Sequence, residues 1–216
     1  MNATDLVKEV AGFLPAAPTP VVAQSIMRAT RELCRDCLCW RHTPYPAPVA
    51  EGEPSVTFYG LPQGSQIVQF ESLVMGGMKL RPTTPTRLAF DDARWDLQVG
   101  PPSQYFKGEE PNQIQLYPIP EAAGELRGTV FLEPMIDAAE LPETLVSEFF
   151  TEILDGALAY LHRFPWAGQN YIDAKYALTA ASTYTARFEA HKRLLRSRAV
   201  DALTRSVARK VTYGGY

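Results

Sequence analysis

The sequence predicts an α+β protein: a helical bundle, made of an N-terminal helix and a C-terminal helical hairpin, with an inserted small β-sandwich or barrel and an extended basic C-terminal tail. Three observations lead to this prediction. Apolar residues recur at helical spacing over residues 21–40 and again after residue 141. Short runs rich in β-branched and aromatic residues occupy residues 49–134. Residues 187–216 carry a clear excess of positive charge.

The size and composition fit a folded protein. With 216 residues, of which 46% are hydrophobic, the chain can bury a core as one domain or as two small ones. The N-terminus lacks a basic region followed by an apolar one, and no run approaches the roughly 18 apolar residues that span a bilayer. All three cysteines lie within one short stretch, which excludes a widely spaced disulfide framework. We therefore expect no export, no membrane anchor and a reducing compartment.

The first expected helix covers residues 21–40, within an N-terminal segment of the bundle that spans residues 1–48. Prolines at positions 15, 18 and 20 precede it, and Pro44, Pro46 and Pro48 end it. Its apolar residues follow steps of three and four, which is typical of one buried helical stripe: Val22, Ile26, Ala29, Leu33, Cys37 and Trp40.

The stretch CRDCLCWRH, residues 34–42, raises the question of a zinc site, because it holds three cysteines and a histidine in the spacing C-x2-C-x-C-x2-H. In a continuous helix Cys34 and Cys37 lie within about 60° of each other, while Cys39 points to the opposite side. The four ligands cannot converge unless the helix unwinds before Cys34. We therefore expect no metal here, with Cys37 as a small core residue and Cys34 at the edge of the same face.

Residues 49–140 are expected to form the β insertion with long loops. The strand-like runs are SVTFYGL, SQIVQFESLVM, QIQLYPIP and GTVFLEP, and the imperfect alternation of the second fits a bulge near Glu71 and Ser72. In MGGMKLRP, paired glycines between Met75 and Met78 predict a tight hairpin turn, although an exposed Met-rich loop could also serve as an adaptable contact. The proline-rich stretch that follows is expected to be a long loop with one short helical turn near residues 91–95.

Residues 141–198 are expected to form the helical hairpin that completes the bundle. Apolar residues from Val146 to Leu161 alternate between steps of three and one, which is the strongest helical signal in the chain. Pro165 and Gly168 end this helix, and a second helix is expected from near Asn170 to about Arg198. The short linker predicts that the two helices are antiparallel.

The C-terminal segment is basic. Residues 187–216 contain eight basic and two acidic side chains, a net charge of +6, so the chain's total of −3 leaves −9 for residues 1–186. Residues 199–216 lack a strong apolar stripe and end in two glycines between tyrosines, so they form either a frayed tail or a segment that becomes ordered against a neighbouring subunit. The residues expected to dock in the second case are Arg198, Arg205, Arg209, Lys210, Tyr213 and Tyr216.

A catalytic constellation is not evident. Phosphate-binding glycine loops and the motifs H-E-x-x-H and G-x-S-x-G do not occur. Of the three histidines, His162 and His191 are expected near helix ends with exposed rings. An enzyme built from His162, Glu148 and Asp155 is the weakest hypothesis, because Glu148 and Asp155 share a helical face that we expect to meet water or a neighbouring subunit. The sequence therefore predicts no catalytic residue, no cofactor and no metal.

The order of segments gives a more specific indication. The helix A-x-R-x-L-C-R-x-C-L-C-W (29–40), the strands QLYPIP (115–120) and VFLEP (130–134), and LPETLVSEFFTEILDGALAYLHRFPW (141–166) together resemble head-to-tail adaptor proteins of tailed bacteriophages. The resemblance covers roughly residues 20–190. It implies a helical bundle with a β insertion, a ring of about twelve copies, and a C-terminal segment that reaches the portal.

The resemblance implies a virion structural protein and no enzyme activity. Its ring would lie beneath the portal, join the capsid to the tail and continue the DNA channel, after assembly in the host cytoplasm. The implied partners are further copies of the chain, the portal protein, a downstream tail or nozzle protein and, in transit, DNA. In the β insertion the candidate contacts with the tail or with a neighbouring subunit are Met75, Met78, Arg81 and Trp95.

One alternative is a DNA-binding packaging accessory protein that acts through the basic C-terminal tail, and it predicts salt-sensitive binding. We favour an acidic portal surface as the partner of this tail. Tight binding to DNA would hinder its passage, and Tyr213 and Tyr216 suit a protein groove better than a smooth channel.

Overall fold

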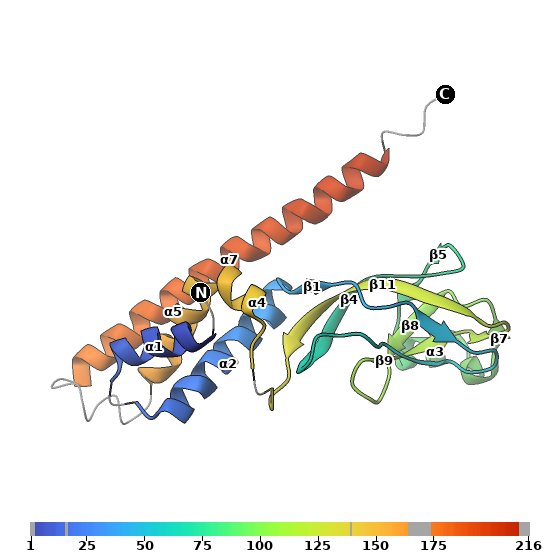
Figure 1. The fold of residues 1–216 in the computed structure, drawn as a ribbon. Helices are drawn as coiled ribbons and strands as arrows, with labels where there is room; N and C mark the ends of the chain where they lie inside the picture. The colour runs from blue at the N-terminus through green and yellow to red at the C-terminus, as the bar shows by residue number, and fades with distance from the viewer. Residues whose placement is uncertain (1–2, 16, 139, 164–173, 212–216) are drawn as a thin grey trace. The chain divides into compact units, whose positions relative to one another are not determined.

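The structure, a computed structural model, shows two compact units (Figure 1). The helical unit contains the residues up to Trp40 and those from Glu133 onward, and the β unit is Arg41–Leu132. The mixed α+β class is confirmed. The structure describes residues 3–15, 17–138, 140–163 and 174–211, and it describes their side chains except those of 174–176 and 200–211.

The helical unit begins with a helix that was not predicted from the sequence, α1 (Ala3–Phe13). Its buried residues Leu6 and Val10 lie one turn apart and pack into the core of this unit. The first predicted helix is present as α2 (Thr19–Cys37), with Pro20 in its first turn.

The helix α2 ends at Cys37, before the predicted end at Trp40. Leu38 adopts a left-handed conformation (φ 51°, ψ 42°), and its N–H donates to the carbonyl of Cys34 at 3.0 Å. This left-handed cap stops the helix, so Cys39 does not continue the helical stripe.

The helix predicted after Pro142 is two helices, α4 (Glu143–Glu148) and α5 (Phe150–Leu161). They meet at Phe149, whose backbone leaves the helical region (φ −117°, ψ 30°). The Phe149 N–H donates to the Leu145 carbonyl and the Ile153 N–H to the Phe149 carbonyl, so helical hydrogen bonding continues through the bend. The side chains of these three residues are buried in the same core.

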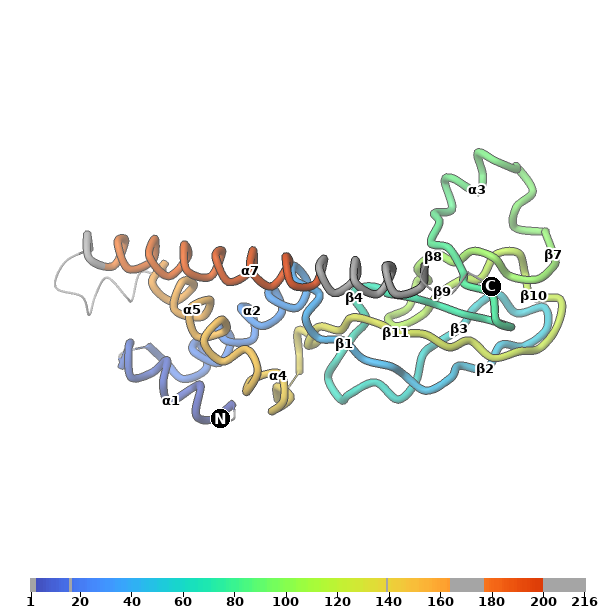
Figure 2. The backbone as a smooth tube through the Cα atoms, turned by 90° about the horizontal axis from the view of Figure 1, so that it is seen from above, coloured from blue at the N-terminus to red at the C-terminus, as the bar shows by residue number. Residues whose placement is uncertain are grey.

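The last helix, α7 (Ala174–Val211), runs antiparallel to α5. Asp155 pairs with His191, and Arg163, farther along the chain, pairs with Thr185, which lies earlier in α7. In Figure 2, α7 lies on one side of α2 and α5, whereas α1 and α4 lie on the other.

The helix α7 continues past its predicted end at Arg198 to Val211. Residues 199–211 are therefore helical, and the prediction of an extended tail is wrong for them. The physical reason is composition: AVDALTRSVARKV contains no glycine or proline, and seven of its thirteen residues are alanine, leucine, arginine or lysine, which favour helices.

One apolar core holds the helical unit together. Three helices approach closely at Gly156, where a Cβ would lie 2.8 Å from both Ala29 Cβ of α2 and Phe188 Cε2 of α7. The absence of a side chain at Gly156 lets α2, α5 and α7 approach closely. The core is formed by buried residues from α1, α2, α4, α5 and α7, among them Leu6, Val22, Ile26, Leu33, Val146, Ile153, Leu158, Leu161 and Phe188.

The β unit starts with β1 (Arg41–His42) and β2 (Ala47–Val49), before the predicted boundary at residue 49, because both strands pair antiparallel with β11 (Gly124–Pro134). The unit ends at Leu132, before the predicted boundary at residue 140. The other strands are β3 (Ser55–Thr57), β4 (Ser65–Met75), β5 (Met78–Lys79), β6 (Arg81–Pro82), β7 (Val99–Gly100), β8 (Gln104–Lys107), β9 (Gln113–Tyr117) and β10 (Ile119–Pro120).

The strands divide among three sheets. One has the order β1-β11-β4-β5 with β2 also on β11, the second is β3-β9-β8-β6, and the third is the parallel pair β10-β7. Strands occur in all four runs that the sequence indicated. Phe70 on β4 packs against Phe58 and Tyr105, whose ring centroids lie 5.4 and 5.6 Å away.

The predicted hairpin turn between Met75 and Met78 is confirmed. Gly76 and Gly77 have φ of 56° and 79°, and Met75 pairs directly with Met78 across the turn. Positive φ at both central residues is the requirement of a type I′ hairpin, which glycine meets without strain.

The proline-rich loop contains more helix than predicted. It holds α3 (Pro85–Asp91) and a 3₁₀ turn at Trp95–Leu97. Thr84 caps α3, since its Oγ1 accepts a hydrogen bond from the Arg87 N–H at 3.3 Å, and Pro85 occupies the first helical position.

Candidate functional site

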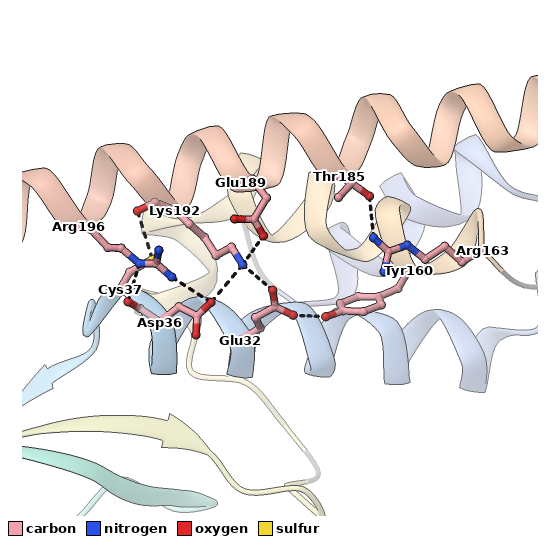
Figure 3. A network of polar contacts seen from close by, with 9 residues as sticks. All are labelled: Glu32, Asp36, Cys37, Tyr160, Arg163, Thr185, Glu189, Lys192 and Arg196. Carbon is pink, nitrogen blue, oxygen red and sulfur yellow. Dashed lines mark hydrogen bonds and ion pairs between the residues drawn. The ribbon is translucent and has the colours of Figure 1, made fainter.

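A buried ammonium group fixes α7 to α2. Figure 3 shows Lys192 Nζ between three carboxylates: it lies 2.6 Å from Glu32, 3.1 Å from Asp36 and 2.6 Å from Glu189. The Lys192 side chain is only 4% exposed, whereas its partners are between 31% and 40% exposed. Arg196 adds a second link, from its guanidinium to the carboxylate and the carbonyl of Asp36. The helix α7 is therefore held to α2 by charge as well as by apolar packing.

The electrostatics of this network favour the charged lysine. Burial alone lowers the pKa of Lys192, but hydrogen bonds to Glu189, Glu32 and Asp36 outweigh burial, and the pKa is raised above its ordinary value. The phenol of Tyr160 donates to the other oxygen of Glu32. Burial and this bond to Glu32 both raise the pKa of Tyr160.

The cysteines of residues 34–42 lie at the C-terminal end of α2, next to this network. Cys37 Sγ donates to the Lys192 carbonyl at 3.6 Å, and Cys34 is buried in the core. The structure corrects the expected position of Cys39: the left-handed cap at Leu38 brings its side chain next to Cys34. His42 lies in the β unit, where its Nε2 is 3.2 Å from the Gly60 carbonyl. In the described part of the chain, no three His, Cys, Asp or Glu side chains are placed to hold a metal ion.

The cysteine environment suppresses thiol ionisation. The hydrogen bond with Cys39, and then burial, raise the pKa of Cys34 well above its ordinary value. Burial raises the pKa of Cys37 to about 12. Thiolates are the reactive form of cysteine, so these two residues have the properties of core residues rather than nucleophiles.

His162, Glu148 and Asp155, the residues of the hypothetical enzyme site, each have different surroundings in the structure. Asp155 is buried and pairs with His191 at 3.1 Å, which corrects the expectation that it faces water or a neighbour. Glu148 lies on α4 and is exposed. His162 is buried and stacks on Tyr184 with ring centroids 5.4 Å apart, contrary to the expected exposed ring, and burial lowers its pKa. His191 lies inside α7 rather than near its end.

A groove of about 570 Å³ runs along α2 in the helical unit. Arg28, Arg31 and Arg35 line it on the face of α2 opposite the buried stripe. Arg31 and Arg35 share one oxygen of the buried Glu133, at 3.5 and 2.7 Å, and Arg28 lies over the Tyr160 ring at 4.4 Å. We call this surface the arginine groove.

A second groove, of about 560 Å³, adjoins the β4–β5 hairpin in the β unit. Met75 and Met78 line it together with Pro101, Pro102 and Gly124. Met78 is 51% exposed, so an unbranched and adaptable side chain is available for contact at the rim. We call this surface the hairpin groove.

The two other predicted contact residues of the β unit lie elsewhere on it. Arg81 is exposed on β6. Trp95 is half-buried and packs edge-on against Phe106 and Tyr117, with centroid distances of 5.7 and 6.2 Å, so much of its ring serves the unit itself.

The predicted docking residues of the C-terminal segment are described only in part. Arg198 is exposed on α7, and Arg205, Arg209 and Lys210 belong to the same helix with side chains outside the described set. Tyr213 and Tyr216 lie outside the described residues.

Two residues of this region, Lys192 and Glu133, were not predicted from the sequence. Lys192 was counted only as a positive charge of the C-terminal segment. Its spacing from Phe188 and Leu195, four and three residues away on the packed face of α7, could have indicated a lysine on the buried side. Glu133 lies next to the last residue of an apolar strand, VFLEP, and this position alone did not indicate its arginine partners.

The described surfaces of the helical unit and of the β unit are therefore an ion-pair network and two exposed grooves. A family model described as SU10 adaptor protein matches residues 1–210, and the chain belongs to this family. The resemblance to phage adaptors is thereby confirmed, and the family gives the chain a structural adaptor role in the virion. No match was found among curated proteins. Among the described residues, no helix has the length and apolar character needed to cross a membrane.

Proposed function

We propose that this chain is the head-to-tail adaptor of its phage, with about twelve copies in a closed ring beneath the portal. The ring joins the capsid to the tail and continues the channel through which DNA passes. The protein then resides in the virion at the head-tail interface and in the host cytoplasm during assembly. It contributes binding surfaces and rigidity, with no catalytic step.

The observation that carries this proposal is the long helix α7. Its contacts with α2 reach Arg196, and the helix continues to Val211, roughly fifteen residues or about 22 Å farther at 1.5 Å per residue. The Lys192 network anchors the near end of this helix. A stiff, anchored and basic helix is suited to reach an acidic portal surface, with Arg205, Arg209 and Lys210 on the helix and Tyr213 and Tyr216 after it.

The β unit is the proposed contact for the downstream tail or nozzle protein. Its hairpin groove combines an apolar surface with the exposed Met78. Arg81, three residues after Met78 in the sequence, carries a positive charge. Methionine side chains adapt to partners of different shape, which suits a junction between two assemblies. Arg81 and Trp95 remain proposed contacts with the tail or with a neighbouring subunit.

The test is the mass of the complex that the purified chain forms with the portal ring. The full chain should add many copies to the ring, measured by native mass spectrometry at low and moderate salt. A chain ending at Arg198 should keep its helical unit, because it retains the described α2–α7 contacts up to Arg196, but it should not join the portal. A chain ending at Val211 keeps the basic residues of the helix but lacks Tyr213 and Tyr216, so it tests the helix without the two tyrosines. Retained portal binding by the shorter chain would contradict docking through α7.

The basic segment of α7 also supports a second candidate function, a DNA-binding packaging accessory role. In that case the chain would not bind the portal. It would bind duplex DNA and slow its migration in a gel, with an affinity that falls steeply as the salt concentration rises. An electrophoretic shift assay with the full chain and the chain ending at Arg198 distinguishes the two functions.

A further inference from the structure

The arginine groove has an excess of positive charge. Glu133 is shared by Arg31 and Arg35, and in the described part of the chain Arg28 contacts the Tyr160 ring without an ion pair. The two acids nearby are already engaged, since Glu32 and Asp36 both bind Lys192. Three arginines and two carboxylates line the groove, and because both carboxylates already bind Lys192, the lining keeps a net positive charge.

The groove also offers apolar contact. Ile136 lines it and is 80% exposed, and Met27 and the face of Tyr160 contribute to the same lining. An exposed isoleucine beside arginines is typical of a protein interface, in which an apolar centre is surrounded by charge.

A complementary acidic surface exists on the same unit. The exposed face of α4 carries Glu143, Thr144, Ser147 and Glu148, and Glu140 is exposed just before it. Within the described residues, none of these three glutamates forms an ion pair. We call this surface the acidic α4 face.

The two surfaces lie on different sides of the helical unit. The arginine groove lies on the face of α2 turned away from the core, whereas α4 packs against α5 and α1. Figure 2 places α4 with α1 on the side of α5 that is turned away from α7. One copy cannot join these surfaces to each other, so both are available to other molecules.

We infer that the arginine groove of one copy receives the acidic α4 face of the next copy, in a heterologous head-to-tail contact that repeats around a ring. This inference rests on the proposed ring and specifies the surfaces that close it. Guanidinium–carboxylate pairs across the contact supply direction and register, and Ile136 adds apolar burial. Because the pairs are at the surface, the contact weakens as salt rises.

The test uses charge reversal and its reciprocal repair. Arg28→Glu or Glu148→Arg alone should weaken self-association at least tenfold, measured by sedimentation at 50 and 500 mM salt for the free chain and by copy number on the portal ring. The chain that carries both reversals should regain association. Arg193→Glu, an equal charge change at an exposed position of α7, is the matched control and should have no effect.

Circular dichroism confirms that each variant is folded, and a cysteine crosslink provides a second measurement. A chain with Arg35→Cys and Glu148→Cys should form a ladder of crosslinked oligomers on the portal, whereas either single variant should not. Self-association that survives both single reversals, or a double variant without recovery, would overturn this interface and leave the ring proposal standing. A chain that neither self-associates nor joins the portal would overturn both.

Discussion

Lys192 Nζ of α7 lies 2.6 Å from Glu32 Oε1 of α2, across the middle of the helical unit. The same nitrogen contacts Asp36 and Glu189, so one buried cation serves three carboxylates. This relationship fixes the direction in which α7 leaves the unit. If α7 is the portal-docking helix, the network determines where that helix points.

Replacing Lys192 with methionine should destabilise the helical unit by about 2–3 kcal/mol, because three carboxylates lose their cation while staying partly desolvated. The partners are about a third exposed, which keeps the loss below that of a fully buried pair. Urea unfolding followed by circular dichroism at 222 nm measures it. Arg193→Met, at the adjacent exposed position, should change stability by less than about 0.5 kcal/mol. Equal effects of the two substitutions would mean that the network contributes no stability.

Replacing Gly156 with alanine should destabilise the unit by about 1–3 kcal/mol, because the new Cβ overlaps with Ala29 and Phe188, which must move. The same substitution at Gly12 in α1 meets no atom within 4 Å and should be neutral or stabilising by about 0.5–1 kcal/mol. Thermal unfolding of the two variants gives the comparison. A stable Gly156→Ala variant would show that α5 and α7 separate easily at this point.

Much of the fold could be predicted because its determinants are local. The stripe of α2, the alternation in β4 and the glycine pair of the hairpin each follow from backbone periodicity or φ preference. The end of α2 could not be predicted in this way, because Leu38 adopts a left-handed conformation that leucine rarely takes.

The candidate site was less predictable because it depends on distant contacts. A lysine in a basic segment is usually solvated, and only its three acidic partners, two of them about 160 residues earlier, show that Lys192 is buried. The continuation of α7 was missed for a different reason. Residues 199–211 lack a strong apolar stripe, but their helix propensity and the absence of glycine and proline favour a helix there.

In the native protein, alkylation at pH 8 should label Cys39 before the other two cysteines. Cys34 and Cys37 are buried and their pKa values are raised, that of Cys37 to about 12, so few thiolates form. Iodoacetamide labelling followed by fragment mass spectrometry measures each site, and the protein in 8 M urea is the control in which all three react. Rapid native labelling of Cys34 would contradict its burial.

The stability of the helical unit should fall between pH 7.5 and 5.5 through His162. Burial lowers its pKa, so in this range the unfolded chain binds more protons than the folded protein, and stability is lost as the pH falls through about 6.5. Urea unfolding at both pH values should show a smaller drop for His162→Gln than for the natural chain. The His42→Gln variant, changed in the β unit, should lose as much stability between the two pH values as the natural chain. If both variants lose the same amount, the pH dependence comes from groups other than His162.

The type I′ turn predicts a local response to substitution at Gly77. Its φ of 79° suits glycine, is tolerated by asparagine and is costly for valine by about 1–2 kcal/mol. The readout is hydrogen exchange of the Leu80 N–H, which donates to the Leu73 carbonyl at 2.9 Å across the hairpin. Gly77→Val should speed this exchange about tenfold or more, and Gly77→Asn should change it little. Met75 and Met78 line the hairpin groove on either side of the turn, so the valine variant should also lower the affinity of any partner that binds there. Unchanged exchange in both variants would show that the strand pairing holds the hairpin independently of its turn.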